Sequence, residues 1–322
     1  MPTVAITDFT FPDLEVEKRI LQSAGLSVVS DQCRTPETVA SLTADVDYVI
    51  TQFAPVTAAA IEAMKNARII VRYGVGYDNV DLDASRKREI PVCNIPGFCT
   101  DEVAEHTVAF ILATTRCVKQ NDARVQSGQW GLGVTLEDMK SLRDMTIGVV
   151  GLGRIGRGVV ERLTPFKCRL LVFDPVVPPD QIEQLGATSV TLQQLFSESD
   201  LVTLHCPSTD QTRGLINTTT LAQIKPGAIL INLGRGDLVN SDDLATALDT
   251  GQIRAAALDV FETEPLPSDS RLRGRDNVIL ASHISSASVS AQRTLRESAA
   301  NLVVMRHLGE PLPNIVNGVE PS

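Results

Sequence analysis

One segment, residues 146–174, constrains the fold more than any other part of the chain: TIGVVGLGRIGRGVVERLTPFKCRLLVFD. Its pattern predicts a strand, a glycine turn, a helix and a second strand that ends in an acid. Gly151, Gly153 and Gly156 form G-x-G-x-x-G directly after the first apolar run. In this pattern the first glycine permits a tight turn, the second lets the backbone approach a pyrophosphate, and the third lets the helix pack on the strand. The diphosphate then lies at the positive end of the helix dipole.

The acid at the end of the second strand is Asp174, 18 residues after Gly156. A carboxylate there can accept hydrogen bonds from both hydroxyls of the adenosine ribose, and it repels a 2′-phosphate. We therefore expect NAD rather than NADP. The alternative, a glycine-rich turn of some other α/β protein, fits the glycines alone but leaves the strands, the helix and the acid unexplained.

Composition limits the class of protein. With 322 residues, 43% hydrophobic and 21% charged, the chain is long enough for two globular domains. A net charge of −10 argues against a nucleic-acid or anionic-membrane partner. No apolar run reaches the roughly 18 residues of a membrane span, and the first residues lack the pattern of an export signal. The six cysteines and four histidines are scattered, so we expect reduced thiols, a cytoplasmic location and no metal.

Strand-like and helical patterns alternate in two sets, which predicts parallel sheets with right-handed crossovers. We expect a doubly wound Rossmann domain over residues 101–286, inserted into a smaller flavodoxin-like α/β substrate domain made of residues 1–100 and 287–322. Helices are expected at Asp101–Val118, after a Thr100 cap, and at Ser286–His307, with further helix starts capped by Thr191, Asn217 and Ser241. In such an arrangement the cleft lies between the domains.

Polar side chains follow several strands of the predicted Rossmann sheet. They are Arg235, Asp259, Glu264, His205 and His283. Because parallel strands bring their carboxyl ends to one edge, where such sheets bind ligands, we expect these side chains near the cofactor.

Three of these residues have the chemistry that hydride transfer to or from a 2-oxo or 2-hydroxy acid requires. His283 suits proton exchange because its ordinary pKa is near neutrality. Arg235 can hold a carboxylate and polarise a carbonyl, and Glu264 can orient the imidazole. Each residue alone fits an ordinary loop, and only their convergence on one edge favours catalysis.

A second candidate site is the segment Arg72–Asp78, RYGVGYD, after a predicted strand. Its two glycines allow backbone N–H groups to point at an anion such as a substrate carboxylate. A plain strand-to-helix turn is the alternative. On the expected helix after residue 100, Thr107 is a candidate cofactor contact, whereas His106 is expected to be structural.

These motifs resemble the D-isomer-specific 2-hydroxyacid dehydrogenase family over nearly the whole chain. The shared motifs are GLGRIG at 151–156, HCP at 205–207, NLGRG at 232–236, DVFETEP at 259–265 and SHIS at 282–285. The resemblance implies Arg235, Glu264 and His283 as catalytic residues and substrate contacts at Val75, Gly76, Arg235 and His283. It further implies NAD contacts at Thr107, Gly151, Gly153, Arg154, Ile155, Gly156, Asp174, His205, Pro207, Thr212, Leu233, Gly234, Arg235, Asp259, His283 and Ser285, with Asp259 at the nicotinamide amide. Members usually form dimers through the nucleotide domain, so the resemblance also implies a homodimer.

The chain also departs from the family pattern. HISSAS at 283–288 replaces a more usual glycine-rich sequence. The stretches YGVGYDNVD and CNIPGFCTDEVAEHT are similar to the C-terminal binding protein branch, which implies an alternative function as an NAD-sensing dimeric scaffold or corepressor. A third possibility is a reductase of a phosphorylated or larger acid. Pocket selectivity is expected to come from Gln52, Phe53, Arg72 and Tyr77.

Overall fold

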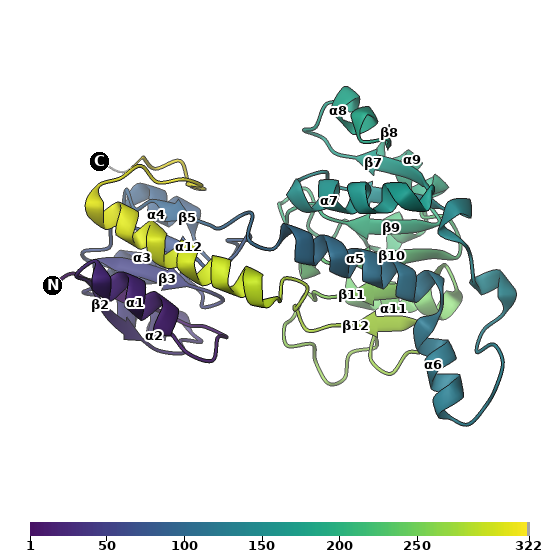
Figure 1. The fold of residues 1–322 in the computed structure, drawn as a ribbon, viewed down its shortest axis with the longest axis horizontal. Coiled ribbons are helices and arrows are strands. Elements are labelled where there is room, and N and C mark those ends of the chain that lie inside the picture. Colours follow the sequence, from purple (N-terminus) through teal and green to yellow (C-terminus); the bar gives the residue numbers. More distant parts are fainter. Residues whose placement is uncertain (321–322) are drawn as a thin grey trace. The chain divides into compact units, whose positions relative to one another are not determined.

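The structure is a computed structural model that describes residues 1–320 and divides the chain into two compact units. The first unit combines residues 1–99 with the segment from Ser288 onward, and the second comprises residues 100–287. The second unit is therefore an insertion in the sequence of the first, as the colours of Figure 1 show.

The first unit contains a five-stranded parallel sheet with the strand order β2-β1-β3-β4-β5, which is the flavodoxin-like order. Its strands are β1 (Thr3–Ile6), β2 (Ser27–Ser30), β3 (Tyr48–Thr51), β4 (Ile70–Arg72) and β5 (Val92–Cys93). Its helices are α1 (Glu15–Ser23), α2 (Pro36–Thr43), α3 (Ala58–Ala63), α4 (Leu82–Lys87) and α12 (Val289–Leu308).

Helices cover both faces of this sheet, so its central strands are apolar on both sides. One core cluster joins side chains of α1 and α12 to Val4, Ile6 and Ile50. The other joins Ala5, Val49 and Ile70 to side chains of α2 and α3. All four residues of β3 are buried. The C-terminal helix thus completes the core that the first hundred residues begin.

The second unit contains a seven-stranded parallel sheet with the order β12-β11-β10-β9-β6-β7-β8, which extends the doubly wound Rossmann order by one strand. Its strands are β6 (Thr146–Val150), β7 (Arg169–Phe173), β8 (Thr188–Ser189), β9 (Leu201–Leu204), β10 (Ala228–Asn232), β11 (Ile253–Leu258) and β12 (Val278–Leu280). Its helices are α5 (Thr100–Thr115), α6 (Val118–Gln126), α7 (Arg154–Leu163), α8 (Pro179–Gln184), α9 (Leu192–Glu198), α10 (Thr218–Leu221) and α11 (Ser241–Thr250). Four 3-10 helices lie at Leu136–Asp138, Leu142–Asp144, Thr164–Phe166 and Gly236–Leu238.

The predicted α/β class with parallel sheets and a Rossmann unit is confirmed, and two of the four predicted caps are correct. The prediction for Thr100 is wrong, because Thr100 is the first residue of α5 rather than its cap. The side chains of Thr191 and Asn217 accept backbone N–H groups at the starts of α9 and α10. The prediction for Ser241 is wrong, because Asn240 is the cap of α11 and Ser241 is its first helical residue. Two adjacent residues could each cap this helix, and only the local backbone decides between them.

Two predicted helices have different ends. The helix expected at Asp101–Val118 includes Thr100 and ends at Thr115, because Cys117 adopts a left-handed φ of 48° and a second helix, α6, starts at Val118. The helix expected at Ser286–His307 begins at Val289, after a Ser288 cap, and ends at Leu308. Both errors fall at boundaries, which hydrophobic periodicity defines poorly.

Across residues 1–320, none of the helices combines the length and the apolar character that crossing a membrane would require.

Candidate active site

The glycine turn lies at the point where the sheet of the second unit reverses its strand order, between β6 and β9. Gly151 has φ of +93°, and a Cβ atom on it would lie 2.6 Å from the Cys206 nitrogen. A Cβ atom on Gly156 would overlap the carbonyl oxygen of Gly151, whereas one on Gly153 would meet only open space. The first N–H groups of α7 have no acceptor within the helix. This geometry is that of a backbone cradle for a diphosphate.

Asp174 follows β7 and braces the glycine turn. Its carboxylate accepts the Leu152 N–H at 2.7 Å and the N–H groups of Val176 and Val177 at 2.8 and 3.0 Å. Burial by itself raises the pKa of Asp174, but these three hydrogen bonds and the charge of Arg157 outweigh it, so the pKa lies below its ordinary value. Asp174 is therefore a fixed negative charge beside the turn.

His205 follows β9 on the other side of the turn. Its backbone N–H donates to the Val150 carbonyl at 2.7 Å, and its Nε2 lies 2.9 Å from the Thr203 hydroxyl. Burial lowers the pKa of His205 to about 4. The imidazole is thus neutral at pH 7, and it joins β9 to the turn without contributing charge.

Arg235 lies beyond β10, in a turn that Asn232 holds. Asn232 is fully buried, and its side chain accepts the Gly234 N–H at 3.0 Å and donates to the Arg235 carbonyl at 2.8 Å. The guanidinium of Arg235 donates to the Gly234 carbonyl at 2.8 Å. Sequence reasoning missed Asn232. An amide at the end of a buried strand, two residues before a glycine, was the available signal.

Glu264 and His283 come together, as predicted. Nδ1 of His283 lies 2.8 Å from Oε2 of Glu264, whose Oε1 accepts the Phe261 N–H at 2.9 Å. Burial alone would raise the pKa of Glu264. The hydrogen bond and charge of His283, the Phe261 N–H and the charge of Arg235 lower it by more, so the pKa of Glu264 lies below its ordinary value. An ionised carboxylate can only accept, so Nδ1 carries a proton and Nε2 is the nitrogen that can exchange one with a substrate.

Asp259 fixes the loop that carries His283. Its carbonyl accepts the His283 N–H at 2.7 Å, and its two carboxylate oxygens accept the N–H groups of Ile284 and Ser285 at 2.8 and 2.9 Å. Asp259 is fully buried, and His283 has a left-handed φ of 58°. Such backbone is uncommon for a residue other than glycine and persists only where its surroundings hold it. Asp259 supplies that support.

The remaining predicted cofactor residues of this unit lie in four places. Thr212 and Pro207 share one loop, where the Thr212 hydroxyl donates to the Pro207 carbonyl at 2.6 Å. Arg154 and Ile155 begin α7, and Leu233 and Gly234 precede Arg235. Thr107 lies in α5 and makes no hydrogen bond to the other three groups. It is fully buried, and its hydroxyl donates to the Val103 carbonyl of its own helix at 2.8 Å.

The predicted anion-binding loop belongs to the first unit, where it follows β4. The N–H groups of Val75 and Gly76 donate no hydrogen bond to any of residues 1–320. Unpaired N–H groups on successive residues are the feature that such an anion site requires.

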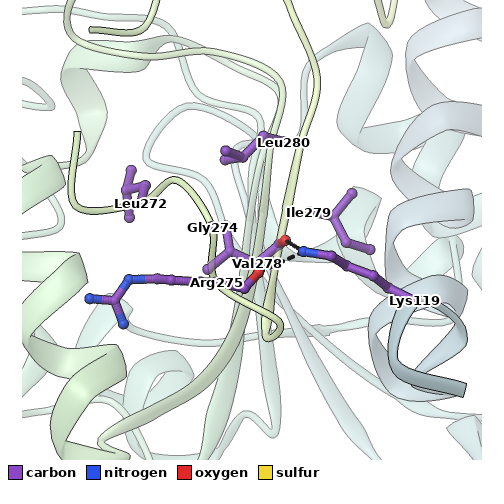
Figure 2. A pocket seen from close by; sticks show the side chains of 7 residues that line it. All are labelled: Lys119, Leu272, Gly274, Arg275, Val278, Ile279 and Leu280. Atoms are coloured by element: carbon purple, nitrogen blue, oxygen red, sulfur yellow. Dashed lines mark hydrogen bonds between the residues drawn. The ribbon is translucent and has the colours of Figure 1, made fainter. Parts of the chain in front are cut away.

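A separate cavity of about 280 Å³ lies beside β12, lined by Leu272, Val278, Leu280 and Lys119 among others (Figure 2). Lys119 donates from Nζ to the carbonyl oxygens of Arg275 and Val278 at 2.6 and 2.8 Å. Ligands of doubly wound sheets bind at the carboxyl ends of the strands. None of the residues that line this cavity belongs to the candidate active site.

Comparison with known proteins places this geometry in context. The family model for the D-isomer specific 2-hydroxyacid dehydrogenase NAD binding domain matches residues 108–285. Glyoxylate reductase of Korarchaeum cryptofilum is 39% identical over 267 residues, which are 82% of this chain and 80% of that protein. D-3-phosphoglycerate dehydrogenase of Archaeoglobus fulgidus is 38% identical over 273 residues, 83% of this chain; the chain spans only 51% of that relative's length. The structure of D-lactate dehydrogenase from Aquifex aeolicus, complexed with NAD and lactic acid, has a TM-score of 0.87 at 28% identity and covers 95% of this chain and 96% of its own.

Proposed function

Because this chain belongs to the D-isomer specific 2-hydroxyacid dehydrogenase family, whose NAD-binding domain it contains, we propose that it transfers a hydride between NAD and a small 2-oxo or 2-hydroxy acid. We assign catalysis to Arg235, Glu264 and His283. The observation that carries this proposal is the 2.8 Å contact between His283 and Glu264 at the carboxyl edge of the sheet that holds the glycine turn.

The residues of the second unit fit the cofactor. Gly151 and Gly156 leave backbone N–H groups for the diphosphate, and Asp174 is a carboxylate for the ribose hydroxyls. We further assign NAD contacts to Thr212, Pro207, Leu233, Gly234, Arg154, Ile155, His205, Asp259, Ser285 and Thr107. When bound, NAD supplies or accepts the hydride.

In the reductive direction, His283 would donate the Nε2 proton to the oxygen of the substrate carbonyl, while Glu264 stabilises the imidazolium from Nδ1. Arg235 would hold the substrate carboxylate and stabilise negative charge that develops on the carbonyl oxygen. The N–H groups of Val75 and Gly76 would contribute to carboxylate binding. Each group then performs one step that its chemistry allows.

The substrate class within this function is a further proposal. Relatives are named for glyoxylate, D-3-phosphoglycerate and D-lactate. A reductase of phosphorylated acids is supported by Arg72, whose guanidinium fills the space of a Cβ on Gly74 and lies 5.6 Å from the Phe53 ring. A fixed positive charge there would attract a second anionic group.

NADH oxidation measured with glyoxylate, hydroxypyruvate, pyruvate and 3-phosphohydroxypyruvate tests these proposals. Turnover of any of them supports the enzyme, and preference for the phosphorylated acid supports the role of Arg72. NAD binding without turnover of any acid, together with cofactor-dependent dimerisation, would favour the scaffold function instead.

We also propose a homodimer in the cytoplasm. The segment from α6 to residue 136 exposes Trp130 by 88% and Leu136 by 72%, together with Val118, Val125 and Leu132. Exposed apolar groups of this extent on one segment are typical of an interface between subunits. The proposed cytoplasmic location is supported separately by the six cysteines, which are free, as in a reducing compartment.

The proposed interface can be tested by substitution. Sedimentation of Trp130→Ser should show weakened association, whereas Val289→Ser, which removes an 80% exposed side chain elsewhere, should not.

A further inference from the structure

The two N–H groups of the Val75–Gly76 loop are set in direction by hydrogen bonds on the opposite side of their peptide planes. The Ile95 N–H donates to the Gly74 carbonyl at 2.9 Å, and the Asn94 side-chain amide donates to the Val75 carbonyl at 2.6 Å. In a trans peptide the C=O and the N–H point in opposite directions. Fixing the Gly74 carbonyl therefore fixes the Val75 N–H, and fixing the Val75 carbonyl fixes the Gly76 N–H.

Both carbonyls are held by consecutive residues, 94 and 95, directly after β5. Both N–H groups consequently point away from that segment and toward a common side. Gly74 makes this arrangement possible, because its φ of +145° is favourable only for glycine. The loop is thus arranged to present two donors to one anion.

Only one of the two constraints depends on a side chain. Asn94 is 6% exposed, and within residues 1–320 its side-chain amide donates to the Val75 carbonyl, 19 residues away in sequence. Asparagine at the end of a strand ordinarily bonds to the backbone of its own turn. A buried amide that instead reaches a distant loop is not explained by the fold of β5 alone.

We propose that Asn94 is a positioning residue that preorganises the Val75 and Gly76 N–H groups for the carboxylate of the substrate. It acts through the Val75 peptide and sets substrate affinity rather than the rate of hydride transfer. This inference rests on the proposed function only for the identity of the anion, because the loop geometry is present in the protein by itself.

Replacing Asn94 by alanine removes the donor and releases the Val75 peptide. The Gly76 N–H is then no longer held toward the substrate carboxylate. We expect the KM for the best 2-oxo acid to rise about tenfold, which corresponds to the loss of one hydrogen bond to a charged group, with kcat and the KM for NADH changed less than twofold. Asn317→Ala is the matched control. Asn317 is a 2% exposed asparagine at the other end of β5 whose side chain donates to the Ile90 carbonyl at 2.8 Å and accepts the Val92 N–H at 3.1 Å, so its loss should lower stability at least as much without changing KM.

Asn94→Asp gives a reversible version of the same test. The carboxyl group that this substitution introduces can donate to the Val75 carbonyl when it is protonated, whereas it repels that carbonyl when it is ionised. The ratio of the variant's KM to that of the wild type should therefore fall toward one as the pH is lowered and rise as the pH is raised. A ratio that does not change with pH would count against the proposal.

Binding of oxamate, measured by calorimetry with NADH-saturated protein, separates this inference from the proposed function. If the wild type binds oxamate and Asn94→Ala binds it about tenfold more weakly, Asn94 positions the loop even where no acid is turned over. Equal oxamate affinity and equal KM in the two proteins, with Asn94→Ala folded, would overturn the proposal. If the wild type binds no oxamate, the anion site is absent and the inference fails. The inference is also overturned if the backbone amide NMR resonances of Val75 and Gly76 are the same in ligand-free Asn94→Ala as in the wild type.

Discussion

The carboxyl edges of the two sheets present different chemical groups. At the edge of the Rossmann sheet, charged side chains follow the strands, and Glu264 and His283 contact each other at 2.8 Å. At the edge of the smaller sheet, the carboxylate of Asp8 is buried and accepts the N–H groups of Gln52 and Phe53, and Asn94 holds the Val75 carbonyl. The first edge displays side chains, and the second displays backbone.

Both edges nevertheless use the same kind of support. Asn232 and Asp259 brace the loops of Arg235 and His283, as Asn94 braces the loop of Val75. A buried amide or carboxylate fixes a loop at the end of a strand through hydrogen bonds to the backbone of that loop. These bonds persist because leaving a buried polar group unpaired is costly. Both units therefore brace their loops with buried polar side chains, and they differ in whether the loop presents a side chain or a backbone N–H group to a ligand.

If the Rossmann edge works through side chains, losing Arg235 should have the largest effect. Arg235→Gln removes the charge to which we assign carboxylate binding and stabilisation of the developing alkoxide. We expect kcat/KM for the best 2-oxo acid to fall roughly 10,000-fold in steady-state assays. Arg235→Lys should recover little, since a lysine cannot make bidentate contacts. A Gln variant within tenfold of the wild type would refute the assignment.

Replacing His283 should give the next largest effect, confined to turnover. In His283→Asn we expect kcat to fall roughly 1000-fold while the KM for NADH changes little, because only proton transfer is lost. His205→Gln is the matched control. It removes the other imidazole of this edge, which is neutral, and should retain kcat within about threefold of the wild type if His205 takes no part in proton transfer.

Asp259→Asn tests the support rather than the displayed group. The amide NH₂ would face an N–H that the carboxylate now accepts, at Ile284 or Ser285. We expect kcat to fall about tenfold and the free energy of unfolding to fall by about 1–3 kcal/mol in urea titrations. Wild-type kcat with reduced stability would show that the His283 loop keeps its geometry without this brace.

The smallest expected effect is the pH dependence that His205 gives to stability. Its pKa is about 4 in the folded protein and about 6.5 when unfolded, so between these values the unfolded chain binds a proton that the folded protein does not. Stability should therefore fall as the pH drops from about 6.5 to about 4, by roughly 1–3 kcal/mol from this group. The urea midpoint of His205→Gln should decline less over the same range. Parallel declines would show that the folded protein does not hold His205 as a neutral imidazole.

Local patterns in the chain were enough to predict the order of the elements, the glycine turn and the polar edge of the larger sheet. Apolar runs and helical hydrophobic spacing gave the alternating strands and helices, and the glycine spacing at 151–156 gave the turn. The order of polar residues after the strands placed Glu264 and His283 at one edge, because parallel strands make that edge common to all of them. Caps at Thr191 and Asn217 followed from side chains that bond to nearby backbone.

The positions where helices break, and the buried side chains that brace the loops, depend on long-range packing. The left-handed Cys117 that separates α5 from α6 has no signature in hydrophobic periodicity. Asp259 reaches the Ser285 N–H across 26 residues, and Asn94 reaches the Val75 carbonyl across 19. Such contacts depend on which strands become neighbours in a sheet. That is a property of the packed chain, whereas propensity and pattern act over only a few residues.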